Sequence, residues 1–268
     1  MPDPLWRQIA EDLRLKIESG ELGSNDRPVP SELELRDQYD ASRNTVRDAV
    51  KWLVTRGLVV TRPGQGTFVV KKINPFVTQL STDIGAGPGA EAAAYISEVG
   101  TRRRVANVSP PRVEIQQAKG LVAYELGLPE GFTVVSRHQQ RFIDRTPWSL
   151  QTSFYPMRLV ELGATQIMRA EDMPRGVVAY IEDTLGIGQA GWRDRFTVRG
   201  PNGVETDFFN LPDDGRIAVF EIVRTGYADS GEPLRVTIST FPADRNQFVM
   251  TVGQVPDDQP VEAPESDH

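Results

Sequence analysis

The sequence predicts an α+β fold in two parts, a small helical domain with a β-hairpin followed by a larger domain built on an antiparallel sheet. The first part is indicated by helically spaced apolar residues up to Gly57, after which two short apolar runs flank a Pro-Gly turn. The second is indicated by alternating runs within residues 133–155 and 218–241, separated by turn sequences. A chain of 268 residues is long enough for two domains with separate cores.

The expected domain boundaries follow from changes in composition along the chain. They are residues 1–73 for the first domain, 74–95 for a linker and the start of the second, 96–250 for the rest of the second, and 251–268 for a tail. The tail is rich in proline and acids and nearly free of apolar residues, so we expect it to be disordered.

The composition, 39% hydrophobic and 25% charged, is typical of a soluble globular protein, with no membrane-length apolar run and no signal-peptide pattern. The absence of cysteine excludes disulfides, thiol catalysis and zinc fingers, and fits a cytoplasmic location. Only two histidines are present. We therefore expect no metal site, no cofactor, no catalytic residues and no membrane partner.

The charge is unevenly distributed. The net charge is −7, but residues 1–75 carry 12 basic against 11 acidic side chains, and the remainder carries 18 against 26. Seven basic residues and one acid, Asp48, lie within residues 41–72. A local positive charge on an acidic protein indicates one surface for nucleic acid and little attraction elsewhere.

Two helices are expected before the basic stretch. Asp3-Pro4 is typical of a helix start, with Asp3 as the capping acid, and a buried stripe follows at spacing four: Leu5, Ile9, Leu13 and Ile17. Ser31-Glu32-Leu33-Glu34 predicts a capping box that opens a second helix, ending near Tyr39. Ser42 then suits the N-cap of a third.

The third helix is expected to be basic on one face. Arg43, Arg47 and Lys51 recur at spacing four, and an apolar stripe occupies another face: Val46, Val50, Leu53 and Val54. Strands over residues 58–60 and 67–70 then flank the turn at 63–66, which completes a winged helix-turn-helix.

The basic face predicts a DNA-reading surface. Arg43, Asn44 and Thr45 lie in the first turn, where a recognition helix meets base edges, and the wing adds Arg62, Gly64 and Gln65. The alternative, a solvated helix face, is less favoured because such faces usually mix both signs of charge, whereas this face is almost free of acids.

The segment PSELELRDQYDASRNTVRDAVKWLVTRGLVVTRPGQGTFV resembles the DNA-binding domain of the GntR family of bacterial repressors, over about residues 4–70. The resemblance implies operator contacts by the start of the third helix: Ser42, Arg43, Asn44, Thr45 and Arg47. It also implies close approach of the wing to the minor groove at Gly64, which has no side chain. Relatives carry an arginine where this chain has Leu33, so that contact is lost or supplied elsewhere, with Arg36 as a candidate.

The second domain shows a sequence of expected elements. The glycine-rich stretch 83–89 is not expected to form a regular element, Leu80 to Asp83 looks like a helix start that could bind an anion, and Arg102-Arg103-Arg104 reads as a solvated edge strand within residues 101–108. Further helices are expected at 118–126 and 176–185, and strands at 133–142, 148–155, 192–199, 218–227 and 234–241.

This domain resembles the UTRA ligand-sensing domain of the HutC subfamily, which shares its fold with chorismate lyase, over about residues 80–247. The motifs are LGL, RFIDRTPW, LQTSFYP, EIVRTGY and DSGEPLRV. The resemblance implies a small-molecule effector site lined by Ser81, Thr82, Asp83, Arg141, Gln151, Glu221 and Tyr227. For Arg141 and Glu221, a salt bridge across the sheet is nearly as well supported as ligand contact.

Two positions depart from relatives that bind sugar phosphates. Gln139 replaces a second arginine, and Gly176-Val177-Val178 replaces a serine–x–tyrosine step at a helix start. Both changes weaken phosphate binding, so we expect a less charged, more apolar effector.

Together these features predict a transcriptional repressor that binds a palindromic operator as a homodimer and responds to a small molecule, and that is not an enzyme. Two alternatives remain: a constitutive regulator whose second domain only dimerises, and a lyase-like enzyme, which no convergent acid–base set supports.

Overall fold

The computed structural model describes residues 3–23, 28–62, 64–70, 75–80, 91–173, 175–212, 215–252 and 254. The chain divides into two compact units, Met1–Ile73 and Asn74–His268, here called the N-terminal and C-terminal units. Among the described residues, no helix has the length and apolar character needed to cross a membrane.

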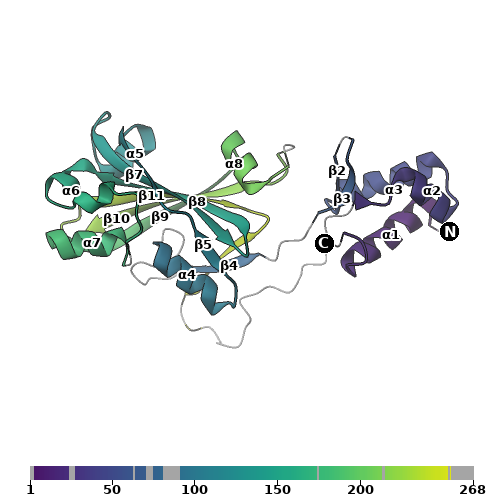
Figure 1. Cartoon of the computed structure of the whole chain (residues 1–268), viewed down its shortest axis with the longest axis horizontal. Helices are drawn as coiled ribbons and strands as arrows, with labels where there is room; N and C mark the ends of the chain where they lie inside the picture. Colours follow the sequence, from purple (N-terminus) through teal and green to yellow (C-terminus); the bar gives the residue numbers. More distant parts are fainter. Residues whose placement is uncertain are drawn as a thin grey trace. The chain divides into compact units, whose positions relative to one another are not determined.

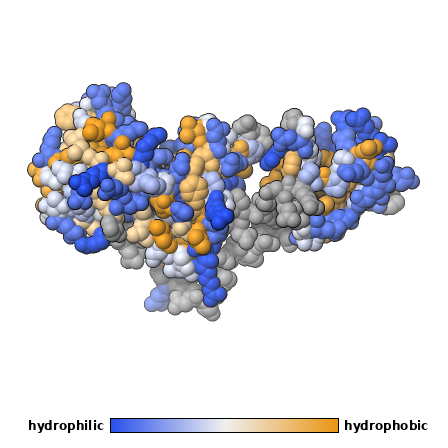
Figure 2. All heavy atoms as spheres, viewed as in Figure 1, coloured by the Kyte–Doolittle hydropathy of each residue, from blue (hydrophilic) through white to orange (hydrophobic). Residues whose placement is uncertain are grey.

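The N-terminal unit is a winged helix-turn-helix, as the sequence predicted (Figure 1). Its elements are α1 (Leu5–Glu18), β1 (Pro28–Val29), α2 (Glu32–Tyr39), α3 (Arg43–Thr55), β2 (Val59–Arg62) and β3 (Gly66–Val69). The three strands form an antiparallel sheet in the order β1-β3-β2. The apolar sides of the three helices meet in one core that includes Leu13, Leu35, Val46 and Leu53. On the side of this unit that Figure 2 shows, the coloured residues are mostly hydrophilic.

The helix starts in this unit are set by local side chains. Ser31 and Glu34 form the expected capping box, which satisfies two backbone N–H groups that α2 would otherwise leave free. Asp40 takes the left-handed conformation at the end of α2 and so turns the chain toward α3. The start of α1 differs from expectation, because the N-cap is Pro4 and no side chain caps the helix. Asp3 instead lies 3.6 Å from Arg7.

The C-terminal unit is built on a large antiparallel sheet. Its elements are β4 (Phe76–Leu80), α4 (Ala92–Thr101), β5 (Ala106–Val108), β6 (Arg112–Gln117), α5 (Gly120–Leu126), β7 (Thr133–Ile143), β8 (Thr146–Pro156), α6 (Met157–Glu161), η2 (Thr165–Met168), α7 (Gly176–Leu185), β9 (Gln189–Arg199), α8 (Gly203–Phe209), β10 (Val219–Ala228), β11 (Pro233–Pro242) and β12 (Asn246–Met250). The strand order is β5-β7-β8-β11-β10-β9, and β6 also pairs with β7.

Helices cover both faces of this sheet, which confirms the predicted α+β class (Figure 1). One face packs Val135 and Tyr155 against α6, η2 and α7, and is here called the α7 face. The other packs Val134 and Val236 against α5, and is here called the α5 face. Helix α8 packs on the α5 face as well, through Phe209 against Val219 and Leu150. Since strand side chains alternate, each position of a strand belongs to one face only.

The segment expected to be a linker with short ordered pieces, and the start of the second domain, contains a strand. Strand β4 pairs in parallel with β12, so residues 76–80 and 246–250 lie side by side although they are far apart in sequence. Phe248 of this pair packs edge-on against Phe196, Phe220 and Phe241 of the main sheet. Leu80 therefore ends a strand and does not begin a helix. The rest of that expected helix start, Ser81 to Asp83, lies outside the described residues.

The arginine run is not an edge strand. Helix α4 continues to Thr101, Arg102 and Arg103 form the turn that follows it, and only residues 106–108 form a strand. Arg103 takes a left-handed backbone conformation, with φ of 57°, which a strand cannot contain. The neighbouring side chains are held by rings, Arg102 over Phe76 and Arg104 over Trp148. The arginine run therefore lies in the turn that follows helix α4.

Candidate functional site

The start of α3 is fixed by its own first residues. The Ser42 hydroxyl accepts a hydrogen bond of 3.2 Å from the backbone N–H of Thr45. The two hydroxyls are also 2.8 Å apart, so Ser42 and Thr45 hold each other at the helix start. This cap directs the first turn of α3, including exposed Arg43 and Asn44, away from the core of the unit.

The exposed face of α3 carries the predicted basic residues. Arg43, Arg47 and Lys51 are all exposed, whereas Val46 and Leu53 are fully buried. A shallow hollow of about 620 Å³ lies on this side of the unit. It is lined by Glu32, Asn44, Arg47, Asp48, Val50, Lys51, Val54 and Thr61. The hollow thus joins α2, α3 and the first strand of the wing into one concave surface.

An acid that the sequence pattern did not place on this face lies beside Arg43. The Glu32 carboxylate of α2 is 3.4 Å from Arg43 Nε. Both side chains are exposed, at 44% for Glu32 and 73% for Arg43, so the pair is weak and easily exchanged for a phosphate or a base. The face is therefore less uniformly basic than residues 41–72 suggest, because α2 contributes to it.

The wing positions are exposed and lie on a tight turn. The Arg62 guanidinium stacks over the Phe68 ring at 4.7 Å, and the Gln65 N–H donates to the Arg62 carbonyl at 3.0 Å. Gly64 has φ of +73°, and a Cβ there would meet nothing within 4 Å. Glycine is thus favoured by the backbone conformation of the turn, and the space above it is open to a partner.

The departure at Leu33 leaves an exposed apolar side chain on α2. Leu33 is 60% exposed, one residue after Glu32. Arg36, the candidate substitute, is exposed on the same helix. The DNA contact by Arg36 stays a prediction.

In the C-terminal unit, two of the predicted effector residues lie on the α7 face. Strand pairing places Arg141 opposite Ser149, and Gln151 opposite both Gln139 and Ser239. These side chains belong to a buried polar strip that runs across three strands: Arg141, Ser149, Gln151, Ser153, Arg235, Thr237 and Ser239. Much of the strip is internally bonded, with Ser239 donating to Gln151 at 3.3 Å and the Ser153 and Thr237 hydroxyls 2.9 Å apart.

Like Arg235, Arg141 is fully buried within the polar strip. It is 1% exposed, and its guanidinium lies 4.7 Å from the centre of the Tyr95 ring of α4. Burial lowers the pKa of Arg141 to about 10. The hydroxyls of Tyr95 and Ser149, buried next to it, form no hydrogen bond within the part of the chain that is described. A polar group of a ligand could satisfy them.

Glu221 and Tyr227 do not join that site, because they lie on the α5 face. Glu221 is 2.7 Å from Arg199 of the neighbouring strand, so it does form a salt bridge across the sheet, but with Arg199 and not with Arg141. Tyr227 packs under the Arg193 guanidinium at 5.7 Å. A single pocket lined by all four predicted residues is therefore excluded.

Arg235 and Glu91 were missed by the sequence reasoning. Arg235 is 1% exposed, and its Nε donates a 3.0 Å hydrogen bond to Gln189 Oε1. Glu91 Oε1 lies 3.6 Å from Nη1 of Arg235. The alternation of Arg235, Thr237 and Ser239 along β11 was the available signal, since it places three polar residues on one face of a central strand. Nothing comparable marked Glu91.

No group of acids or histidines within the described ranges is arranged to hold a metal ion. Gln139, one of the two positions expected to weaken phosphate binding, donates to Asp172 at 2.8 Å and to the Ser109 carbonyl at 3.2 Å. Its amide is thereby used within the chain.

Comparison with known proteins assigns both units. Residues 5–69 match the gntR family of bacterial regulatory proteins, and residues 111–247 match the UTRA domain. An HTH-type transcriptional regulator of Rhizobium meliloti is 31% identical over 243 residues, which cover 90% of this chain and 92% of that protein. The histidine utilization repressor of Klebsiella aerogenes is 26% identical over 150 residues, or 56% of this chain and 57% of the repressor.

Solved structures agree on the fold. The crystal structure of PhnF from Mycobacterium smegmatis superposes with a TM-score of 0.53 at 20% identity, covering 91% of this chain and 99% of that one. With both units matched in order, this chain belongs to the GntR family of bacterial transcriptional regulators, as a HutC-like member that joins a winged helix-turn-helix to a UTRA domain.

Proposed function

We propose that the protein is a ligand-responsive repressor that binds a palindromic operator as a homodimer. The observation that carries the proposal is the exposed face of α3, where Arg43, Arg47 and Lys51 border a hollow beside the wing. The histidine utilization repressor, to which the chain is similar, supports a repressing role by its name. The proposed DNA contacts are Ser42, Arg43, Asn44, Thr45, Arg47, Arg62, Gly64 and Gln65.

In this proposal, α3 enters the major groove. Arg43 and Arg47 read guanines or grip phosphates, and the two recognition helices of a dimer lie about 34 Å apart on successive grooves. The exposed Glu32–Arg43 pair opens at small cost when DNA arrives, because both side chains are already hydrated.

The effector is proposed to bind on the α7 face, at the polar strip. The polar side chains of the strip are already placed by strand pairing, and the hydroxyls of Ser149 and of Tyr95 in α4 form no hydrogen bond among the described residues, so they are available to a polar ligand. Binding there changes operator affinity only if the effector favours one of two arrangements of the dimer.

Two other functions give different experimental results. A constitutive regulator would bind operator DNA with an affinity that no small molecule changes. A lyase-like enzyme would convert a substrate, and the relatives named as transcriptional regulators speak against it.

The test is a thermal-shift screen of metabolites on the whole chain, followed by operator binding in the presence of each hit. An effector at 100 times its Kd stabilises the folded state by about 2.7 kcal/mol and should lower operator affinity. Gln151→Ala should blunt this response, and Tyr227→Ala on the α5 face serves as the control that retains it. Operator binding that no hit alters would favour the constitutive reading.

A further inference from the structure

A carboxylate of the chain itself occupies the start of α7. Glu91, which precedes α4, reaches across so that its Oε1 accepts a 3.0 Å hydrogen bond from the backbone N–H of Val178. The same oxygen lies 3.6 Å from Nη1 of Arg235. The Glu91 side chain is 19% exposed and Arg235 only 1%. Glu91 therefore joins three elements at a largely buried point.

Gly176 makes the room that this carboxylate needs. A Cβ built on Gly176 would lie 1.5 Å from Glu91 Oε2, closer than any real contact. Gly176 also has φ of +85°, a conformation that other residues rarely adopt. The first residue of α7 is thus a glycine for two reasons: its backbone conformation favours glycine, and a side chain there would collide with Glu91.

The position that Glu91 fills is suited to an anion. The first N–H groups of a helix have no partner within the helix and carry partial positive charge, and α7 has 10 residues. Arg235 adds a buried full charge. Arg141 is close enough for its charge to interact with Glu91. Without a negative group, these cations would face one another in a buried place, which is costly.

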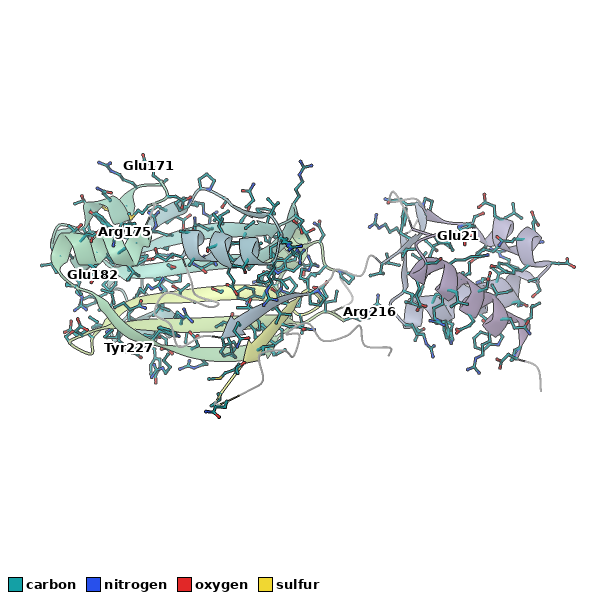
Figure 3. The ribbon with its side chains drawn as sticks, turned by 90° about the horizontal axis from the view of Figure 1, so that it is seen from below. Glu21, Glu171, Arg175, Glu182, Arg216 and Tyr227 are labelled. Carbon is teal, nitrogen blue, oxygen red and sulfur yellow. The ribbon has the colours of Figure 1, made fainter. Side chains whose placement is uncertain are left out.

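Two polar groups that a neutral ligand could bond lie close to Arg141, and a separate hollow opens beside Gly176. The buried hydroxyls of Tyr95 and Ser149, next to Arg141, form no hydrogen bond among the described residues. A hollow of about 400 Å³ that includes Gly176, Tyr180 and Gln166 in its lining opens at the start of α7. Figure 3 labels two more residues of that lining, Glu171 and Arg175.

We propose that Glu91 is a specificity-determining residue of the effector site: it supplies from within the chain the negative charge that the α7 start and Arg235 bind. The effector is then an uncharged, hydroxyl-bearing compound, and a phosphate or carboxylate group is excluded from this position. The proposal rests on the proposed function in calling the ligand an effector, but the anion preference of the site is a property that can be measured without DNA.

The experiment measures binding of inorganic phosphate to the whole chain by its effect on the unfolding temperature, at constant ionic strength. The wild type should show no saturable shift. Glu91→Ala frees the α7 start and Arg235, so it should bind phosphate at least about tenfold more tightly than the wild type. Glu182→Ala, which removes a carboxylate at the other end of α7, is the matched control and should behave as the wild type.

A second variant ties the new phosphate site to its cation. Adding Arg235→Ala to Glu91→Ala should abolish the phosphate response. Glu91→Gln, which keeps the size and one hydrogen-bond acceptor but not the charge, replaces Glu91→Ala if that variant does not fold, and should also gain phosphate binding.

Two results would overturn the inference. One is a saturable phosphate response of the wild type that Arg235→Ala removes, because an outside anion would then displace Glu91. The other is an unchanged response in folded Glu91→Ala or Glu91→Gln. Gained phosphate binding in these variants, together with operator affinity that no compound alters, would leave the occupation of the α7 start by Glu91 standing, and would reject the proposed function and with it the effector role of this residue.

Discussion

At the scale of single residues, the buried arginines of the sheet show how charge is accommodated. Arg137 donates to the carbonyls of Ile167, Arg169 and Glu171, and so holds the segment after η2 against β7. Arg224 pairs with Asp194 of the neighbouring strand at 2.7 Å. Because buried charges need partners, most of these arginines serve the fold, and an arginine in a strand pattern does not by itself indicate a ligand contact.

Asp144 offers a pH test of one such local contact. Its carboxylate accepts from the Val105 N–H at 2.9 Å and from Arg104 Nε at 2.7 Å, and these bonds hold its pKa below the usual 3.8. A lowered folded pKa gives stability that is present above the unfolded pKa and lost as the pH falls through the folded one.

Asp144→Asn should therefore lower stability above about pH 5, by under about 1 kcal/mol because the ion pair is partly exposed. The difference from the wild type should shrink as the pH falls below 4 toward the folded pKa. Asparagine suits the backbone here, where φ is 50°, so the variant isolates the charge. Thermal unfolding of both proteins across pH checks this, and a difference that grows on acidification would refute it.

At the scale of elements, local signals were reliable where the cause is local. The Ser31–Glu34 capping box, the Ser42 cap and the left-handed Gly127 and Gly186 after α5 and α7 all follow from residues within one turn. The hairpin joining β10 and β11 was likewise predicted from its Asp-Ser-Gly-Glu turn.

The capping box makes a quantitative prediction for α2. Ser31→Ala removes the hydroxyl that accepts from the Glu34 N–H and should cost about 1 kcal/mol. Hydrogen exchange of α2 amides in the whole chain should then be roughly fivefold faster. Ser19 lies exposed at the C-terminal end of α1, so Ser19→Ala serves as the control and should change the hydrogen exchange of the α2 amides little. Equal protection of α2 in both variants would show that the cap does not stabilise the helix.

Elements that depend on distant partners could not be predicted in the same way. Among the described strands, β4 pairs with β12 alone, about 170 residues later, and its own five residues carry no turn signal. Strand β6 and helix α8 were missed, because each is short and its residues are largely exposed or packed against remote strands. The arginine run after α4 was expected to be a solvated strand. Its contacts with the rings of Phe76 and Trp148 could not be predicted, because these residues lie in other elements.

At the scale of the whole molecule, the sequence predicted two units and their kinds but not which side chains converge. Arg141 and Glu221 were expected in one pocket because relatives suggested it, yet strand register puts them on opposite faces of the sheet. A shift of one residue reverses every side chain in a strand, so a pattern without register cannot assign a site. Glu91 and Arg235 entered the site only once tertiary packing was known.

The charge distribution also acts at this scale. The acidic remainder of the chain repels DNA, so the exposed face of α3 and the wing have to supply the attraction. Arg43 lies in the first turn of α3, and Leu33 offers no charged group to DNA, so in the proposed function we expect a larger share of base recognition to fall on Arg43.

The most direct test is the operator affinity of Arg43→Ala, measured by fluorescence anisotropy at one fixed salt concentration against Arg7→Ala. Arg7 is exposed on α1 and serves as an equal loss of charge away from the α3 face. Arg43→Ala should weaken operator binding roughly tenfold or more, since one bidentate base contact is worth about 1–3 kcal/mol. It should also reduce the ratio between the affinity for the operator and the affinity for altered sequences. Arg7→Ala should retain the operator affinity and the preference for the operator over altered sequences. Equal affinity and equal base preference in the two variants would contradict the assignment of α3 as the DNA-reading helix.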